Sequence, residues 1–213
     1  MAPRNKFSRQ ELIEAAFRIV RAKGFDALTA KALADKLGIS TRPIFTCFGS
    51  MDEVRREVRA AAEALYRQYT EDGLREHIPF FGFGMQYIRF ALEEPELYRL
   101  LFLCRAGEGS AMEAMQRSQA MVRPSLERIY HIHAEEADRY FRDLWLVVHS
   151  LATLIVTGNC PYSESEIGQI LTGFSVSICQ SIKQIPGFVS GSFDRDAVFS
   201  RLLREDAPEG ESI

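Results

Sequence analysis

The stretch from Thr29 to Phe48 constrains the fold most, because its turn can be read residue by residue. Thr29 can cap a first short helix, which carries apolar residues at helical spacing. Gly38 follows this helix at the position where a left-handed C-terminal cap favours glycine. Ser40 is predicted to cap a second helix over residues 41–48. Two short helices joined in this way form a helix-turn-helix, and an ordinary helical hairpin is the alternative.

The residues on both sides of this hairpin indicate further helices. Ser8 and Glu11 fit the capping box of a helix that ends at Gly24. Ser50 opens another helix with acidic residues in its first turn. Motifs at fixed spacing then follow one another: T-x-x-x-[LI]-A at residues 29–34, G-[IV]-S at 38–40 and [LI]-[YF]-x-x-F-x-S-x-[DE]-E at 44–53.

In their order and spacing, residues 8–58 resemble the DNA-binding domain of the TetR family of transcriptional repressors. The resemblance implies that the second helix enters the major groove of a double-stranded DNA operator. Arg42 can reach guanine or a phosphate, and hydroxyl groups and a lysine at helix starts can bind phosphates. A solvated side chain is the alternative at each position. The predicted DNA-binding residues are Thr29, Lys31, Ser40, Thr41, Arg42, Phe45 and Thr46.

Three positions depart from the family pattern and remove phosphate contacts. Phe45 stands where the family usually has tyrosine, Cys47 where it has histidine, and Met51 where it has lysine. These changes put DNA affinity in question more than the docking mode. Replacement contacts are expected from a basic N-terminal arm that contains Arg4, Lys6 and Arg9.

The rest of the chain also has helical periodicity, and no segment alternates convincingly like a strand, so the predicted fold is all-α. A DNA-binding domain over residues 1–50 and a ligand-binding and dimerisation domain over 51–213 are expected. The expected body helices cover 51–69, 84–93, 95–103, 111–131, 135–157, 163–185 and 194–204. A loop is predicted at Gly107 and Gly109, and Pro124 is expected to kink or split its helix.

Two body segments, at residues 93–102 and 145–158, resemble ligand-binding domains of the same family. The resemblance implies a cavity among these helices for a small-molecule effector, and the aromatic residues suit a largely apolar ligand. Core packing is the alternative for each of them. His149 is either a core histidine or a polar anchor of the ligand. The predicted pocket residues are Phe83, Tyr87, Tyr98, Phe102, Met115, Trp145 and His149.

Apolar residues on the last two long helices, among them Leu151 and Phe174, predict a homodimer. A two-fold axis can then present two recognition helices to successive major grooves. The distribution of charged residues along the chain favours DNA binding by the N-terminal part only. The net charge of the chain is −3, but residues 1–60 hold 12 Lys and Arg against 7 Asp and Glu, and the remainder holds 14 against 22.

Several functional classes have no support in the sequence. The chain contains no P-loop, no GxSxG and no HExxH, so we expect no enzyme, no metal and no cofactor. Cysteines 47, 104, 160 and 179 are scattered and no apolar run could span a bilayer, which suggests a cytoplasmic protein without membrane contact. The predicted function is a homodimeric repressor released by a small ligand. A helical small-molecule-binding or adaptor protein with weakened DNA binding is the alternative.

Overall fold

The computed structural model describes residues 7–103 and 111–205, and within these ranges it contains ten α-helices, one short 3-10 helix and no strand. The predicted all-α fold is confirmed. In chain order the elements are α1 (Arg9–Lys23), η1 (Phe25–Ala27), α2 (Ala30–Leu37), α3 (Arg42–Cys47), α4 (Met51–Leu74), α5 (Pro79–Glu93), α6 (Pro95–Phe102), α7 (Ala111–Tyr130), α8 (Ala134–Val156), α9 (Glu164–Gln184) and α10 (Arg195–Glu205).

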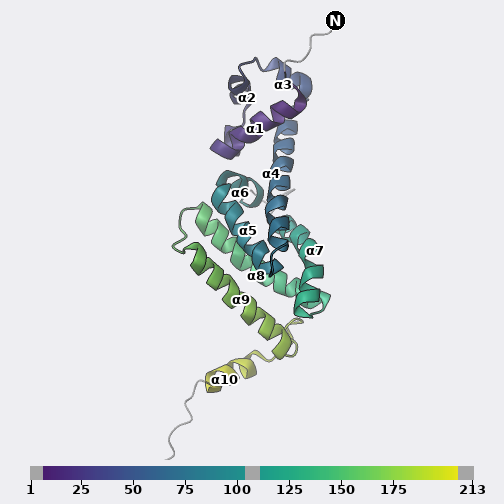
Figure 1. Ribbon diagram of the computed structural model, residues 1–213, viewed down its shortest axis with the longest axis vertical. Coiled ribbons are helices and arrows are strands. Elements are labelled where there is room, and N and C mark those ends of the chain that lie inside the picture. The colour runs from purple at the N-terminus through teal and green to yellow at the C-terminus, as the bar shows by residue number, and fades with distance from the viewer. Residues whose placement is uncertain (1–6, 104–110, 206–213) are drawn as a thin grey trace, which may run out of the picture.

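The helices form a small module at one end of the molecule and a larger body below it (Figure 1). The module contains α1 to α3, and the long helix α4 runs from the module into the body. In the body α5 packs on α4 and α8, while α7 and α9 lie on different sides of α8. Helix α10 projects from the far end. None of the described helices is both long and apolar enough to cross a membrane.

The local signals in the module give most of the predicted helix ends. The Ser8–Glu11 capping box is present, the Thr29 side chain accepts from the backbone N–H of Ala32, and Gly38 is left-handed with φ 64° and ψ 38°. The predicted cap at Ser40 is wrong. Helix α3 begins at Arg42, so Thr41 is its N-cap; the Thr41 carbonyl accepts from the N–H groups of Ile44 and Phe45, and no side chain caps the helix.

The predicted boundary between α4 and α5 is also wrong. Helix α4 continues to Leu74 instead of ending near residue 69, and α5 begins at Pro79 instead of residue 84. Gly73 and Gly82 interrupt neither helix. They let the two backbones touch, since a Cβ on Gly73 would lie 2.5 Å from the carbonyl oxygen of Gly82.

Helix α7 continues through Pro124, so the predicted split of the helix is wrong. The proline ring is exposed, so the backbone carbonyl that loses a partner there is near solvent. The other body helices lie close to their predicted bounds, and the Ser163–Glu166 capping box is present. The predicted loop at Gly107 and Gly109 lies outside the described residues, as do Arg4, Lys6 and Cys104.

An ion pair between an exposed arginine and a buried glutamate joins the module to the body. Glu94, at the corner between α5 and α6, is almost completely buried. Its carboxylate accepts from both Nε and Nη2 of Arg21 on α1, with 2.6 Å between Nε and Oε2. A carboxylate in such a position needs a close cation, because burial removes its hydration. The pair therefore fixes where the last turn of α1 meets the body.

Candidate DNA interface and ligand cavities

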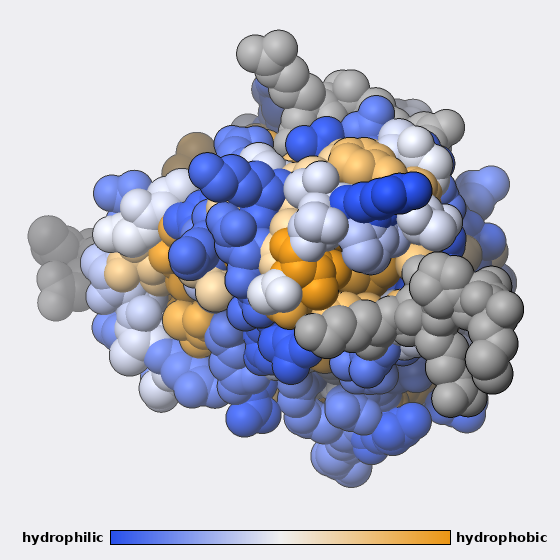
Figure 2. All heavy atoms as spheres, turned by 90° about the horizontal axis from the view of Figure 1, so that it is seen from above, coloured by the Kyte–Doolittle hydropathy of each residue, from blue (hydrophilic) through white to orange (hydrophobic). Residues whose placement is uncertain are grey.

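Helix α3 exposes one face and buries the opposite one. Arg42, Phe45 and Thr46 follow the i, i+3, i+4 spacing of a single helix face, and all three are exposed. Ile44 and Phe48 point the other way and are completely buried. Phe45 is an apolar residue on this face and is nevertheless 49% exposed. This end of the molecule is mainly hydrophilic, with separate hydrophobic areas between the polar side chains (Figure 2).

The other predicted DNA-binding residues also lie at the surface of the module. Thr29, Lys31, Ser40 and Thr41 are all exposed. The Thr29 hydroxyl accepts from the N–H of Ala32 at 3.1 Å, so its own proton remains able to bind a phosphate oxygen. The Thr46 hydroxyl instead donates to the carbonyl of Arg42 at 2.9 Å, and its lone pairs remain available. The geometry therefore leaves all seven predicted residues accessible to a nucleic acid.

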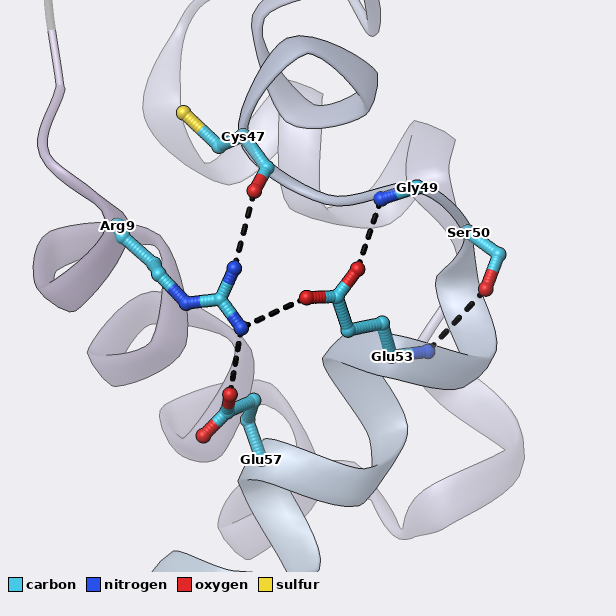
Figure 3. Close-up of polar contacts among 6 residues, drawn as sticks. All are labelled: Arg9, Cys47, Gly49, Ser50, Glu53 and Glu57. Atoms are coloured by element: carbon cyan, nitrogen blue, oxygen red, sulfur yellow. Dashed lines mark hydrogen bonds and ion pairs between the residues drawn. The ribbon is translucent and has the colours of Figure 1, made fainter.

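Arg9 does not extend outward as part of a basic arm, contrary to the sequence prediction. Its guanidinium donates to the carbonyl of Cys47 at 3.0 Å, to Glu53 at 2.8 Å and to Glu57 at 2.6 Å (Figure 3). It also lies over the ring of Phe48, 4.4 Å from the centroid. The side chain thus connects the start of α1 with the end of α3 and the first turns of α4.

Glu53 completes this arrangement, which we call the Arg9 clasp (Arg9, Cys47, Glu53 and Glu57). Its second carboxylate oxygen accepts from the backbone N–H of Gly49 at 2.8 Å. The hydrogen bond from Arg9 and then the one from Gly49 hold the pKa of Glu53 below its usual value of 4.5. The clasp fixes the chain segment between α3 and α4. Sequence alone gave no signal for it, because its partners are about forty residues apart.

Four of the predicted pocket residues pack directly against one another. The rings of Trp145 and His149 stack with centroids 4.7 Å apart. Nδ1 of His149 lies 3.0 Å from the hydroxyls of both Tyr87 and Tyr98. Burial lowers the pKa of His149, so the neutral ring is favoured and the lone pair of Nδ1 can accept from the Tyr87 hydroxyl. The Tyr98 hydroxyl can donate to the backbone carbonyl of His149 at 3.3 Å. In this state His149 is a core histidine bonded to its neighbours.

The remaining three predicted pocket residues are also packed. Phe83 lies edge-on to Phe141, and Met115 is buried. Phe102 contacts Tyr66 and Tyr98, and it lines a small cavity of about 90 Å³ between α4, α6 and α7. The seven residues thus belong to a densely packed core, and only Phe102 among them lines the small cavity.

A larger cavity, of about 290 Å³, lies between α5, α8 and α9 and is lined by a different set of residues. Its apolar wall includes Phe80, Phe81, Leu144, Val148, Leu171 and Val176. Its polar groups include the side chains of Tyr130, Thr172 and Ser175. Sequence reasoning missed this site. The available signal was the run of small residues on α9 opposite large ones on α5, which leaves space between the helices.

The outer surfaces of α8 and α9 are partly apolar. Leu146 and Leu154 on α8 and Phe174 on α9 are exposed. Leu151, which was predicted to lie on this surface, is only 6% exposed and belongs to the core. Its helix position turns it toward the interior of the body, so we expect a charge there to destabilise the body itself.

Two family models match the chain. The model described as bacterial regulatory proteins, tetR family, matches residues 12–58, and the model described as tetracyclin repressor-like, C-terminal domain, matches residues 80–171. Together they cover more than half of the chain, and they correspond to the module with its link to α4 and to most of the body. A search of curated proteins gave no match.

Proposed function

Because the chain belongs to the TetR family of bacterial DNA-binding transcriptional regulators, we propose that it is a homodimeric repressor released from its operator by a small ligand. The observation that supports this best is the exposed face of α3, where Arg42, Phe45 and Thr46 stand together. A helix with this face suits the major groove. The family consists of regulators rather than enzymes, and we propose a cytoplasmic protein.

The proposed dimer rests on the apolar residues Leu146, Leu154 and Phe174 on the outer surfaces of α8 and α9. A monomer leaves them in water, whereas a two-fold contact would bury them. The two modules would then be held at a fixed separation, as binding to two half-sites requires. Release follows if the ligand favours a different separation of the two recognition helices.

Sedimentation tests the dimer with a matched pair of variants. Phe174 and Val176 are 48% and 49% exposed and lie on different sides of α9. Phe174→Glu should halve the sedimenting mass, because unpaired carboxylates would meet at the axis. Val176→Glu should leave the mass unchanged. A wild-type mass near 24.2 kDa at micromolar concentration would contradict the dimer.

A mobility-shift assay with DNA from upstream of the protein's own gene tests operator binding. The wild type should shift this DNA, and an equally long coding fragment should need far more protein. The alternative is a helical adaptor that keeps the hairpin only as structure, and the replacements Phe45, Cys47 and Met51 favour it. Equal, weak binding to both fragments would support the adaptor.

A further inference from the structure

The cavity between α5, α8 and α9 has the properties of a binding site for an uncharged molecule. Its volume of about 290 Å³ is close to the lower end of the ~300–1,000 Å³ range of ligand pockets. No charged side chain lines it within the described chain. The wall is made mostly of aromatic and branched aliphatic side chains. An ionised ligand would therefore lose its hydration without gaining a partner.

A chain of hydroxyl groups gives this cavity one polar side. Ser175 and Tyr140 share a short hydrogen bond, and Tyr140 donates to the hydroxyl oxygen of Tyr130 at 3.3 Å. Burial raises the pKa of Tyr140, so its hydroxyl stays protonated. The Tyr130 hydroxyl then accepts from Tyr140, and its own proton has no acceptor among the residues that the structure describes. Tyr130 lines the cavity and can donate this proton to a ligand.

We propose that this cavity is the effector site and that it takes a neutral ligand with an apolar body and one hydrogen-bond acceptor, such as a carbonyl oxygen, directed at Tyr130. The inference rests on the proposed ligand-released regulator and deepens it. It places the effector among Phe81, Val148, Leu171 and Val176 rather than in the packed aromatic core around His149.

The contact between α4 and α5 explains how this site reaches the DNA-binding module. Phe81 and Gly84 line the cavity, and Gly82 between them faces α4. A Cβ on Gly82 would lie 2.2 Å from the carbonyl oxygen of Gly73, so the backbones of α4 and α5 touch directly at these two glycines. A displacement of α5 by the ligand therefore moves α4 directly, and α4 contributes Glu53 and Glu57 to the Arg9 clasp at the end of α3.

The test uses Prodan, a neutral naphthalene ketone whose emission responds to polarity and to hydrogen bonding. The full-length protein is titrated with Prodan in the absence of DNA. Val176→Trp fills the cavity mouth from an exposed position, and Met112→Trp on α7, with 52% exposure, is the matched control. Tyr130→Phe removes the proposed donor and keeps the ring. Circular dichroism establishes that each variant is folded.

We expect saturable, blue-shifted Prodan emission with the wild type and with Met112→Trp. Val176→Trp should weaken binding about tenfold or more, because the added ring occupies the ligand volume. Tyr130→Phe should weaken binding about fivefold, the usual effect of one lost hydrogen bond. Equal binding by Val176→Trp, or no saturable binding by the wild type, would overturn the site.

A separate measurement distinguishes failure of the site from failure of the proposed function. DNA binding is followed by fluorescence anisotropy with and without saturating Prodan. Lower DNA affinity in the wild type, but not in Val176→Trp, supports both the site and its role in release. Prodan bound in the cavity without any effect on DNA would leave the site in place and contradict ligand release. If Val176→Trp changes the sedimenting mass but not Prodan binding, a second copy of the chain covers the cavity and the proposal is wrong.

Discussion

The DNA-binding module and the body are stabilised by different kinds of interaction. In the module, short helices begin and end at capping residues, and the Arg9 clasp joins their ends by hydrogen bonds at the surface. In the body, long helices are held by large rings such as Tyr87, Tyr98 and Trp145, which touch edge to face or in stacks. The module therefore depends on polar geometry near solvent, whereas the body depends on close packing.

Trp145→Ala should have the largest effect, because it removes the largest fully buried side chain of the body. The expected loss is about 3–5 kcal/mol of unfolding free energy, the usual range for such a truncation. Urea denaturation followed by circular dichroism measures it. Trp145→Phe should lose clearly less, since the indole N–H has no hydrogen-bond partner among the described residues. A loss below about 1 kcal/mol for the alanine variant would mean that the aromatic core does not dominate the body's stability.

Arg42→Ala should affect function without affecting stability. We expect a loss of about 1–3 kcal/mol in operator binding, because Arg42 stands on the exposed face of α3 and can contact a base or a phosphate. Fluorescence anisotropy with a selected operator measures the affinity, and thermal denaturation should be unchanged. An unchanged affinity would remove Arg42 from the DNA interface.

The Arg9 clasp should make a small contribution to stability that depends on pH. The folded-state pKa of Glu53 lies below its ordinary value of 4.5, so the contribution is present above about pH 4.5 and is lost as the pH falls through the lowered pKa. Thermal denaturation of wild type and Glu53→Gln between pH 7 and pH 3 compares the two. The difference between their melting temperatures should shrink in acid. A constant difference would show that the Glu53 charge does not matter.

Phe45 should give the smallest effect, and one that depends on the bases contacted. The exposed ring can make an apolar contact with the C5-methyl group of thymine. Uracil in place of thymine in a selected operator should weaken wild-type binding a few-fold at the contacted position. Phe45→Ala should bind both duplexes equally. A similar response of the two proteins to uracil would exclude this contact.

The contrast between module and body also explains which sequence predictions succeeded. The ends set by Ser8, Thr29 and Gly38 are local signals, because each cap acts on backbone groups a few residues away. The extent of α4 and α5 could not be predicted in this way. The expected ends near residues 69 and 84 were wrong, because Gly73 and Gly82 pack against each other where α4 crosses α5, and such a contact between two helices cannot be read from the spacing within either one.

The candidate sites show the same division. The exposed residues of α3 follow from helical spacing, and the structure places Arg42, Phe45 and Thr46 on one face. The pocket prediction used residue type, and aromatic residues serve equally well as core and as cavity lining. Whether Tyr87 and Trp145 touch each other or surround a space depends on the relative positions of α5 and α8. The periodicity of the sequence does not predict these positions.

The Arg21–Glu94 pair has a consequence for protein engineering. One way to build a sensor is to fuse the DNA-binding module of one regulator to the ligand-binding body of another. A chimaera that keeps the body of this chain from residue 51 onward would keep the buried Glu94 but lose the Arg21 guanidinium that pairs with it. A DNA-binding module without an arginine at the position of Arg21 would leave the Glu94 carboxylate buried without a cation and would destabilise the chimaera. Replacing Glu94 at the same time by an uncharged residue of similar size would avoid this loss.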